Sequence, residues 1–157
     1  MALSGKISIE VMIQSPAAKF FNVFTNQVYN FQNICERVHQ GKLHEGDDWH
    51  STDSAKQWTL LIDGKIITLK ENIEGVDEEN KSITYNFFDG DISPQYKAFK
   101  VFFQVIENEK NDNGIASTKF SIEYEKNNEN VETPYGFLEF FDKAIKEVDV
   151  HLLNNAA

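Results

Sequence analysis

The sequence is short of cysteine and of positive charge, and each shortage excludes a class of protein. Its 157 residues include one cysteine and three prolines, and 15 Lys and Arg stand against 25 Asp and Glu, a net charge of −10. A single cysteine, Cys35, forms no intramolecular disulfide, so the fold does not depend on oxidation. The acidity argues against binding to nucleic-acid phosphates or to anionic membranes. The composition therefore predicts a reduced, cytoplasmic protein whose partners are neither nucleic acid nor membrane.

Long hydrophobic runs are also missing. No stretch approaches the roughly 18 apolar residues of a membrane-spanning helix, and the first residues lack the basic segment and apolar run of a signal peptide. The chain is nevertheless 41% hydrophobic and contains 13 phenylalanines, which is enough for a sizeable core. We therefore expect residues 1–157 to form a single domain.

The helical pattern appears near both ends of the chain. Ser15-Pro16 predicts a capped helix start, and apolar residues at helical spacing follow as far as Phe24. The apolar cluster over residues 28–34 predicts a second short helix. Thr133-Pro134 repeats the start signal, and a broad apolar stripe from Phe137 onward predicts a long C-terminal helix.

Between these helices the pattern is that of strands and turns. Alternation over residues 6–13 predicts a half-buried first strand. Asp63-Gly64 is a strong hairpin signal, and residues 111–114 predict another turn. The further strands are expected at 34–44, 57–62, 65–70, 82–88, 96–107 and 117–125. Successive hairpins indicate an antiparallel meander. One long helix covers such a sheet but leaves a gap if the sheet is strongly curved, and this gap is either a cavity or a dry core of phenylalanines. Composition by itself favours the dry core.

Three groups of short motifs carry a resemblance to a known family. They are Trp58 followed by Ile62-Asp63-Gly64-Lys65, Gly90-Asp91 leading to residues 96–99, and residues 122–126 with Asn128-Glu129. In this order the chain resembles, from Ser4 to about Leu153, the major latex protein and ripening-related branch of the birch-pollen-allergen superfamily, the plant pathogenesis-related class 10 proteins. The resemblance implies an α+β helix-grip fold, in which a seven-stranded curved antiparallel sheet grips a long C-terminal helix and two short helices follow the first strand.

The resemblance also implies a large internal pocket for hydrophobic or amphipathic small molecules, which replaces the dry core. The expected function is that of a plant cytoplasmic carrier for a hormone, sterol or secondary metabolite, linked to defence or stress, acting as a monomer or weak dimer without a cofactor. A pocket enzyme such as an isomerase or cyclase is the alternative. A protein-interaction role is a third, and it would require an exposed apolar patch. The loop over residues 45–56 has one glycine, so a phosphate nest and nucleotide binding are not expected.

Residues on the expected inner faces are candidates for ligand contact. They are Phe24, Tyr29, Phe31, Trp58, Leu60, Ile66, Thr68, Ile83, Tyr85, Phe87, Phe99, Val101, Phe103, Phe137, Phe140, Phe141 and Ala144. On the seventh strand, alternation favours Phe120, Ile122 and Tyr124 inside, but the face stays open. Because many rings converge, the pocket is expected to be narrow and to prefer flat or slender ligands.

Other reactive residue types do not form a recognisable site. The histidines His39, His44 and His50 lie near the acidic residues Glu45, Asp47 and Asp48. However, the first two histidines point to opposite faces of a strand, so no metal site is expected. Cys35 is interpreted as a small buried residue rather than a nucleophile.

Acid–base catalysis has candidates but no clear pair. The ionisable groups considered are Lys70, Glu71, Tyr85, Glu123 and Tyr124. Lys70 and Glu71 are neighbours on one strand and so face opposite sides. The charges are interpreted as part of the convex surface, and the two tyrosines as groups that orient a ligand through their hydroxyls. No catalytic residue is expected.

Overall fold

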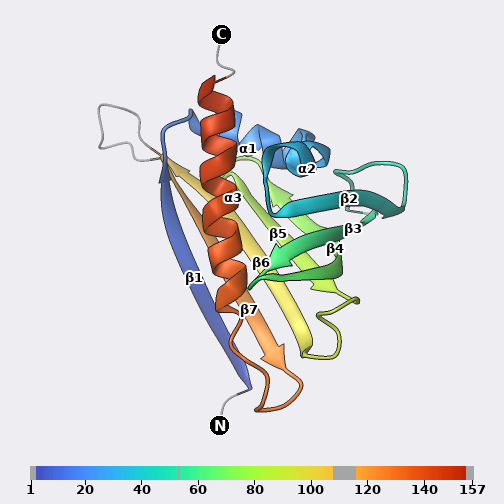
Figure 1. The fold of residues 1–157 in the computed structure, drawn as a ribbon. Coiled ribbons are helices and arrows are strands. Elements are labelled where there is room, and N and C mark those ends of the chain that lie inside the picture. Colours follow the sequence, from blue (N-terminus) through green and yellow to red (C-terminus); the bar gives the residue numbers. More distant parts are fainter. Residues whose placement is uncertain (1–2, 53, 108–115, 155–157) are drawn as a thin grey trace.

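The computed structural model describes residues 3–52, 54–107 and 116–154, and it shows a curved antiparallel sheet wrapped around one long helix (Figure 1). The strands are β1 (Ser4–Ile13), β2 (Val38–Glu45), β3 (Ala55–Ile62), β4 (Lys65–Asp77), β5 (Ser82–Phe88), β6 (Tyr96–Glu107) and β7 (Ala116–Lys126). The helices are α1 (Ala17–Asn26), the 3-10 turn η1 (Val28–Asn30), α2 (Phe31–Ile34) and α3 (Tyr135–Asn154). The fold class expected from the sequence is confirmed.

The sheet order explains how the site is enclosed. The seven strands follow the order β1-β7-β6-β5-β4-β3-β2, and each neighbouring pair is antiparallel. Helix α3 runs along the concave side, where it contacts β1, β3 and β7 (Figure 1). Helices α1 and α2 lie across one end of the sheet, and α1 packs on β6 while α2 packs on β2. The interior is thus bounded by the sheet, by α3 and by the two short helices.

Two of the expected boundaries need correction, and one expected turn is not described. The second strand begins at Val38 and not at residue 34, because residues 31–34 remain helical and the Cys35 N–H donates to the Phe31 carbonyl at 2.8 Å. Strand β4 continues to Asp77, well past the expected end at Lys70, because it pairs with β3 first and with β5 beyond. The turn expected at 111–114 lies outside the described residues.

The corner between β1 and α1 is joined to the far end of the chain by a buried carboxylate. Asp149 on α3 accepts the backbone N–H groups of Gln14 (3.0 Å) and Ser15 (2.9 Å), and the Ser15 hydroxyl donates to it at 2.5 Å. The expectation that Ser15 caps α1 is therefore wrong: Pro16 occupies the N-cap, no side chain caps the helix, and the Ser15 hydroxyl is used by Asp149. These bonds hold α3 against the start of α1.

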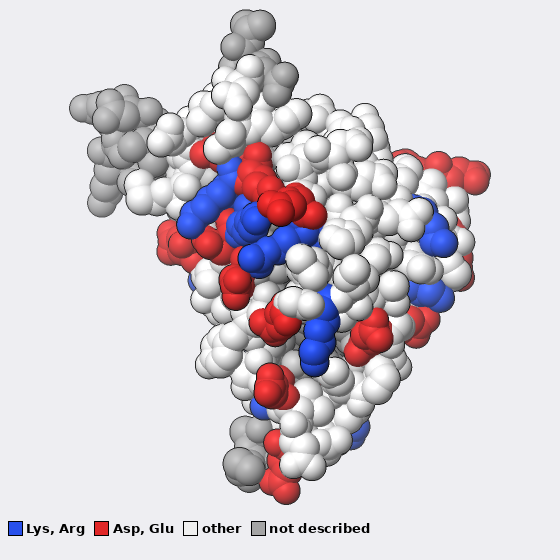
Figure 2. All heavy atoms as spheres, in the orientation of Figure 1, with Lys and Arg blue, Asp and Glu red and all other residues white. Residues whose placement is uncertain are grey.

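On the face shown in Figure 2, charges of both signs are interleaved over α3. Lys143 pairs with Glu36 of the segment after α2 at 2.9 Å, and Lys146 pairs with Asp142 one turn away at 3.2 Å. Exposed pairs of this kind contribute little to stability, typically under about 1 kcal/mol. Among the described residues, no helix combines the length and the apolar character that crossing a membrane requires.

We predict that Asp149→Ala lowers the free energy of unfolding by about 3 kcal/mol, because buried N–H and hydroxyl donors lose a charged acceptor. Asp142→Ala on the same helix removes an exposed carboxylate and is the matched control, with an expected loss below about 0.5 kcal/mol. Urea denaturation followed by fluorescence measures both. Equal small losses would show that the Asp149 bonds do not hold the corner.

Candidate functional site

An internal cavity lies between the concave face of the sheet and α3, and its volume is about 80 Å³. Its walls come from every layer of the fold. The lining residues are Phe24, Val28, Phe31, Cys35, Val38, Trp58, Leu60, Glu71, Tyr85, Phe87, Val101, Phe120, Phe140, Phe141, Ala144, Ile145 and Val148. Nearly all of these side chains are apolar, and Glu71 is the one charged group among them.

More than half of the residues expected to contact a ligand line this cavity. They are Phe24, Phe31, Trp58, Leu60, Tyr85, Phe87, Val101, Phe140, Phe141 and Ala144. Four others are buried in the core but lie outside the lining. These are Ile83, Phe99, Phe103 and Phe137. On β7, Phe120 does line the cavity, Ile122 is buried without lining it, and Tyr124 is half-buried beside Tyr96, with ring centroids 6.1 Å apart.

The expected inward positions of Ile66 and Thr68 are wrong, because the β3–β4 hairpin places them on the convex face. The tight turn at Asp63-Gly64 pairs Ile66 with Leu61 and Thr68 with Thr59, and directly paired residues share a face. Ile66 is 60% exposed. The inward set on β4 is the alternate one, which includes the buried Leu69, Glu71 and Ile73.

Tyr29 also lies outside the cavity. Its side chain is 43% exposed, and its ring meets Trp49 and His50 at centroid distances of 6.4 and 6.3 Å. The cause is the turn η1, which directs Val28 inward and Tyr29 outward.

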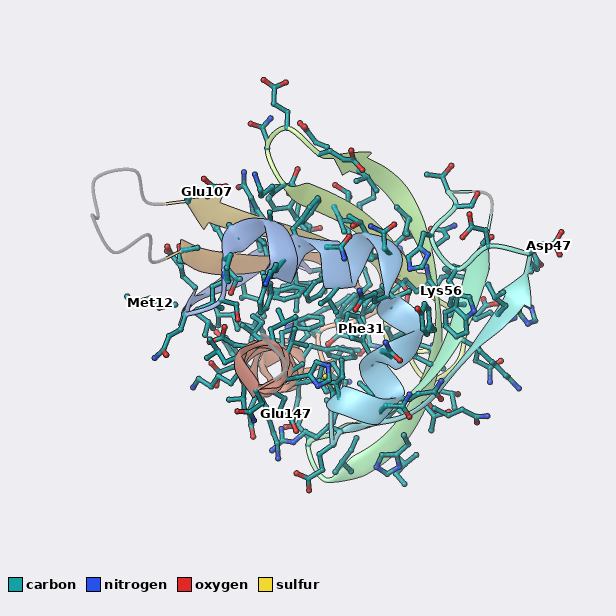
Figure 3. All side chains as sticks on the ribbon, turned by 90° about the horizontal axis from the view of Figure 1, so that it is seen from above. Met12, Phe31, Asp47, Lys56, Glu107 and Glu147 are labelled. Carbon is teal, nitrogen blue, oxygen red and sulfur yellow. The ribbon has the colours of Figure 1, made fainter. Side chains whose placement is uncertain are left out.

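Aromatic rings make the cavity narrow. Phe141 on α3 stacks on Phe120 of β7 with centroids 4.2 Å apart and planes 5° apart, while Phe24 of α1 stacks on Phe103 of β6 at 4.1 Å. The Phe31 ring meets Phe24 edge-on at 5.0 Å, and Figure 3 shows Phe31 in the interior between the short helices and α3. Each ring removes volume from the space between helix and sheet. The cavity persists and is narrow, as the sequence predicted.

A polar cluster is built into this apolar wall from the adjacent strands β3 and β4 and the segment between β2 and β3. Lys56 of β3 is directly paired with Glu71 of β4, and its ammonium lies 3.7 Å from Glu71 Oε2. The Trp58 indole N–H donates to the same oxygen at 2.7 Å. Lys56 is 0% exposed, and its ammonium also donates to the Trp49 carbonyl at 2.8 Å. Lys56 comes from the β3 side of the fold in Figure 3.

The position of Trp58 depends on a glycine across the strand pair. Gly41 of β2 is paired with Trp58, and a Cβ built on Gly41 would overlap the six-membered part of the indole ring. A side chain at this position would therefore displace the ring that donates to Glu71. Gly41 thus leaves the space that lets the cluster form.

Glu71 corrects the interpretation of the ionisable residues as convex-surface charge. It is 5% exposed, and burial raises the pKa of its carboxyl, although Lys56 and the Trp58 N–H act in the opposite direction. Burial, followed by the nearby Glu71 carboxylate, raises the pKa of Tyr85 well above its usual value. By contrast, Lys70 faces outward, where its ammonium lies 3.3 Å from Asp89 Oδ2, and Glu123 is exposed. As expected, Lys70 and Glu71 lie on opposite faces.

Several lining residues escaped prediction because their inward positions depend on packing. Val28, Cys35 and Val38 lie in or beside short helical turns, where no periodic pattern is long enough to define a face. Ile145 and Val148 belong to the apolar stripe of α3 and were available from its helical spacing. Glu71 was available from the hairpin register, which pairs it with Lys56.

A metal ion has no site in the ranges that the structure describes. Within residues 3–52, 54–107 and 116–154, no group of three His, Cys, Asp or Glu side chains is close enough together to hold one. His39 and His44 are both exposed on β2.

We predict that Cys35 reacts slowly with thiol reagents. Burial raises its pKa from 9.0 to about 12, and the Glu147 carboxylate contributes to the rise. At pH 8 the folded protein then holds about a thousandfold less thiolate than an ordinary thiol. Because the folded state keeps a proton that the unfolded chain releases, the associated stability is lost as the pH rises from 9 toward 12. Ellman's reagent measures the rate, with urea-unfolded protein as control. Rapid reaction of the native protein would contradict this placement.

Comparison with known proteins places the chain in a family. Residues 2–155 match the model of the pathogenesis-related protein Bet v 1 family. MLP-like protein 43 of Arabidopsis thaliana is 36% identical over 153 residues, which are 97% of this chain and 95% of that protein. MLP-like protein 31 of the same plant is 33% identical, over 98% of this chain and 88% of the relative.

Solved structures agree with this placement. The ginseng major latex-like protein 151 from Panax ginseng superposes with a TM-score of 0.87 at 28% identity, over 96% of this chain and 98% of the other. Ara h 8.0201 has the same fold, with a TM-score of 0.74 at 15% identity, over 97% and 99% of the two chains. Because the family model spans nearly the whole sequence, this chain belongs to the Bet v 1 family of pathogenesis-related proteins, as an MLP-like member with a fold that binds hydrophobic ligands.

Proposed function

We propose that residues 1–157 form one ligand-binding domain that carries a hydrophobic or amphipathic small molecule in the cavity beneath α3. The ligand is a plant hormone, a sterol or a secondary metabolite, and the carrier works in the cytoplasm in defence or stress responses. The observation that carries the proposal is the cavity itself, an apolar, largely aromatic space in a fold that binds hydrophobic ligands. Transfer of an apolar molecule from water into such a cavity is favourable, so binding stabilises the folded protein.

The cavity volume restricts the ligand. An engineered apolar cavity of about 150 Å³ in another protein binds benzene, and the space here is about 80 Å³. A flat or slender molecule therefore fits with small rotations of the wall side chains, whereas a bulky polycyclic one requires the rings of Phe141 and Phe120 to separate. We infer that the wild-type protein prefers small flat ligands.

The test of binding is a titration with toluene followed by the amide shifts in NMR spectra. Wild-type protein is expected to show saturable shifts concentrated at the lining residues of β3, β5 and α3. A control titration with glycerol, which is polar, should leave these shifts unchanged. If toluene produces no shift at the lining residues up to its solubility limit, the cavity binds no apolar ligand and the proposal fails.

We predict that Phe141→Ala widens the cavity and costs about 3–5 kcal/mol of stability, because a packed ring is deleted. The variant should bind the larger uncharged dye N-phenyl-1-naphthylamine at least about tenfold more tightly than the wild type, since about 1.4 kcal/mol of added burial suffices. Dye fluorescence gives the dissociation constant, and urea denaturation gives the free energy of unfolding.

Phe137→Ala provides the matched control. Phe137 lies one turn earlier on α3 and is 7% exposed, like Phe141, but it packs on Phe99 with centroids 4.9 Å apart and does not line the cavity. The control should lose similar stability and gain no dye affinity. Equal dye binding by the two variants would mean that Phe141 does not wall the pocket.

Glu71 supports a second candidate function, that of a pocket enzyme such as an isomerase or cyclase. A buried carboxyl with a raised pKa beside a tyrosine is the type of group that general acid–base catalysis uses. Incubation of plant metabolite extracts with the protein, followed by mass spectrometry, separates the two candidates. A compound that is converted by the wild type and left intact by Glu71→Gln indicates an enzyme, whereas a compound that is bound and recovered unchanged indicates a carrier.

A further inference from the structure

We propose that Glu71 and Tyr85 form a polar subsite that binds a hydroxyl group of the cavity's ligand. In this subsite the Tyr85 hydroxyl donates to the oxygen of the ligand, and the ligand's own O–H donates to the Glu71 carboxylate. The inference rests on the proposed function, because it names the chemical class of the molecule that the cavity takes.

The strand register places the two side chains together on one face. Strand β4 is paired with β5 so that Glu71 lies opposite Phe87, and Ile73 lies opposite Tyr85. Tyr85 and Glu71 are therefore diagonal neighbours on adjacent strands, a spacing that long and aromatic side chains bridge. Both residues line the cavity. A single small group of a ligand is thus within reach of both.

The Tyr85 side chain lies in the cavity wall, and its hydroxyl is unused by the described residues. Tyr85 is 5% exposed and lines the cavity, and none of the hydrogen bonds among the described residues uses its hydroxyl. A hydroxyl in an apolar wall is stabilised when it donates to an acceptor. An acceptor on the ligand would supply that bond. This open donor is the observation that points to a polar group on the ligand.

Glu71 supplies the complementary acceptor. The indole N–H of Trp58 and the ammonium of Lys56 both approach its Oε2, at 2.7 and 3.7 Å. No hydrogen bond from the described part of the chain reaches Oε1. One carboxylate oxygen is therefore held in place by Trp58 and Lys56, while the other remains as an acceptor in a wall that is otherwise apolar.

The charges of the cluster select a neutral ligand group. A ligand carboxylate would face the Glu71 carboxylate, and a ligand ammonium would add a second cation to the site that Lys56 already neutralises. Either charge would also lose its hydration in a small apolar cavity. A carbonyl or ether accepts from Tyr85 but has no proton for Glu71. A hydroxyl is the simple group that both donates and accepts.

The first test compares phenol with toluene, which have the same number of heavy atoms, in the wild type and in Tyr85→Phe. Phenol affinity is expected to fall about three- to tenfold in the variant, because one hydrogen bond is lost, while toluene affinity stays the same or rises. The comparison between variants cancels the difference in hydrophobicity of the two probes. NMR titration of each pair gives the dissociation constants.

Tyr96→Phe is the matched control for this cycle. Tyr96 is also a buried tyrosine, but its hydroxyl donates to the Glu132 carbonyl at 2.6 Å, and it does not line the cavity. Its removal should leave the ratio of phenol to toluene affinity unchanged. If Tyr96→Phe changes the ratio as much as Tyr85→Phe does, the effect is structural and the subsite is refuted.

The second test examines the acceptor role of Glu71 in the unmodified protein, so it does not depend on a variant that folds. Anisole is the methyl ether of phenol and lacks the O–H donor. Ethylbenzene is larger than toluene by one carbon, as anisole is larger than phenol, so the second pair controls for size. The affinity ratio of phenol to anisole should exceed that of toluene to ethylbenzene by about three- to tenfold. Equal ratios would show that the ligand gives no hydrogen bond to Glu71.

The outcomes separate this inference from the proposed function. If toluene binds but neither phenol test shows the expected difference, the cavity binds apolar ligands and the subsite is refuted. If none of the probes binds, both proposals fail. Cyclohexanol and methylcyclohexane, titrated in the same way, distinguish an alcohol from a phenol as the source of the hydroxyl, and a Tyr85-dependent preference in either pair supports the subsite.

Discussion

The structure depends on one geometric constraint: a single helix must cover the concave face of a seven-stranded curved sheet. Packing and the hydrogen bonds of Asp149 hold α3 against the corner between β1 and α1. The curvature of the sheet nevertheless leaves space between the sheet and the helix. Large rings from both sides occupy most of this space, and stacked pairs such as Phe141 and Phe120 define its width. The cavity is the volume that these rings do not fill.

The polar cluster is an unfavourable element within that apolar interior. Removing a lysine and a glutamate from water costs several kcal/mol for each ion, and their mutual attraction recovers the cost only when further hydrogen bonds satisfy both groups. Lys56 meets this condition through Glu71 and the Trp49 carbonyl, and Glu71 through Trp58. Both stated partners of Glu71 approach Oε2, and Glu71 also lines the cavity. The cluster therefore includes a carboxylate that is part of the cavity wall, which a purely structural ion pair does not require.

Prediction from the sequence succeeded where a pattern was long and failed where a face was fixed by pairing. Alternation over β6 identified Phe99, Val101 and Phe103 as inward, and all are buried. On β4 the first apolar residues were assigned to the wrong face, so Glu71 was interpreted as convex-surface charge. The two-residue turn at Asp63-Gly64 already pairs residue 62 with residue 65, and counting back from that turn places Glu71 opposite Lys56.

The sequence by itself determined the order of the elements, the antiparallel meander, the long amphipathic helix and the family, because these depend on local periodicity, turn residues and motif order. Only the tertiary structure decided that Ser15 binds Asp149 instead of capping α1, that Tyr29 turns outward, and that Lys56, Trp58 and Glu71 meet. Each of these depends on contacts between residues distant in the chain or on the rotation of a short turn. Local pattern does not fix such contacts, because their free energy arises only when the layers pack.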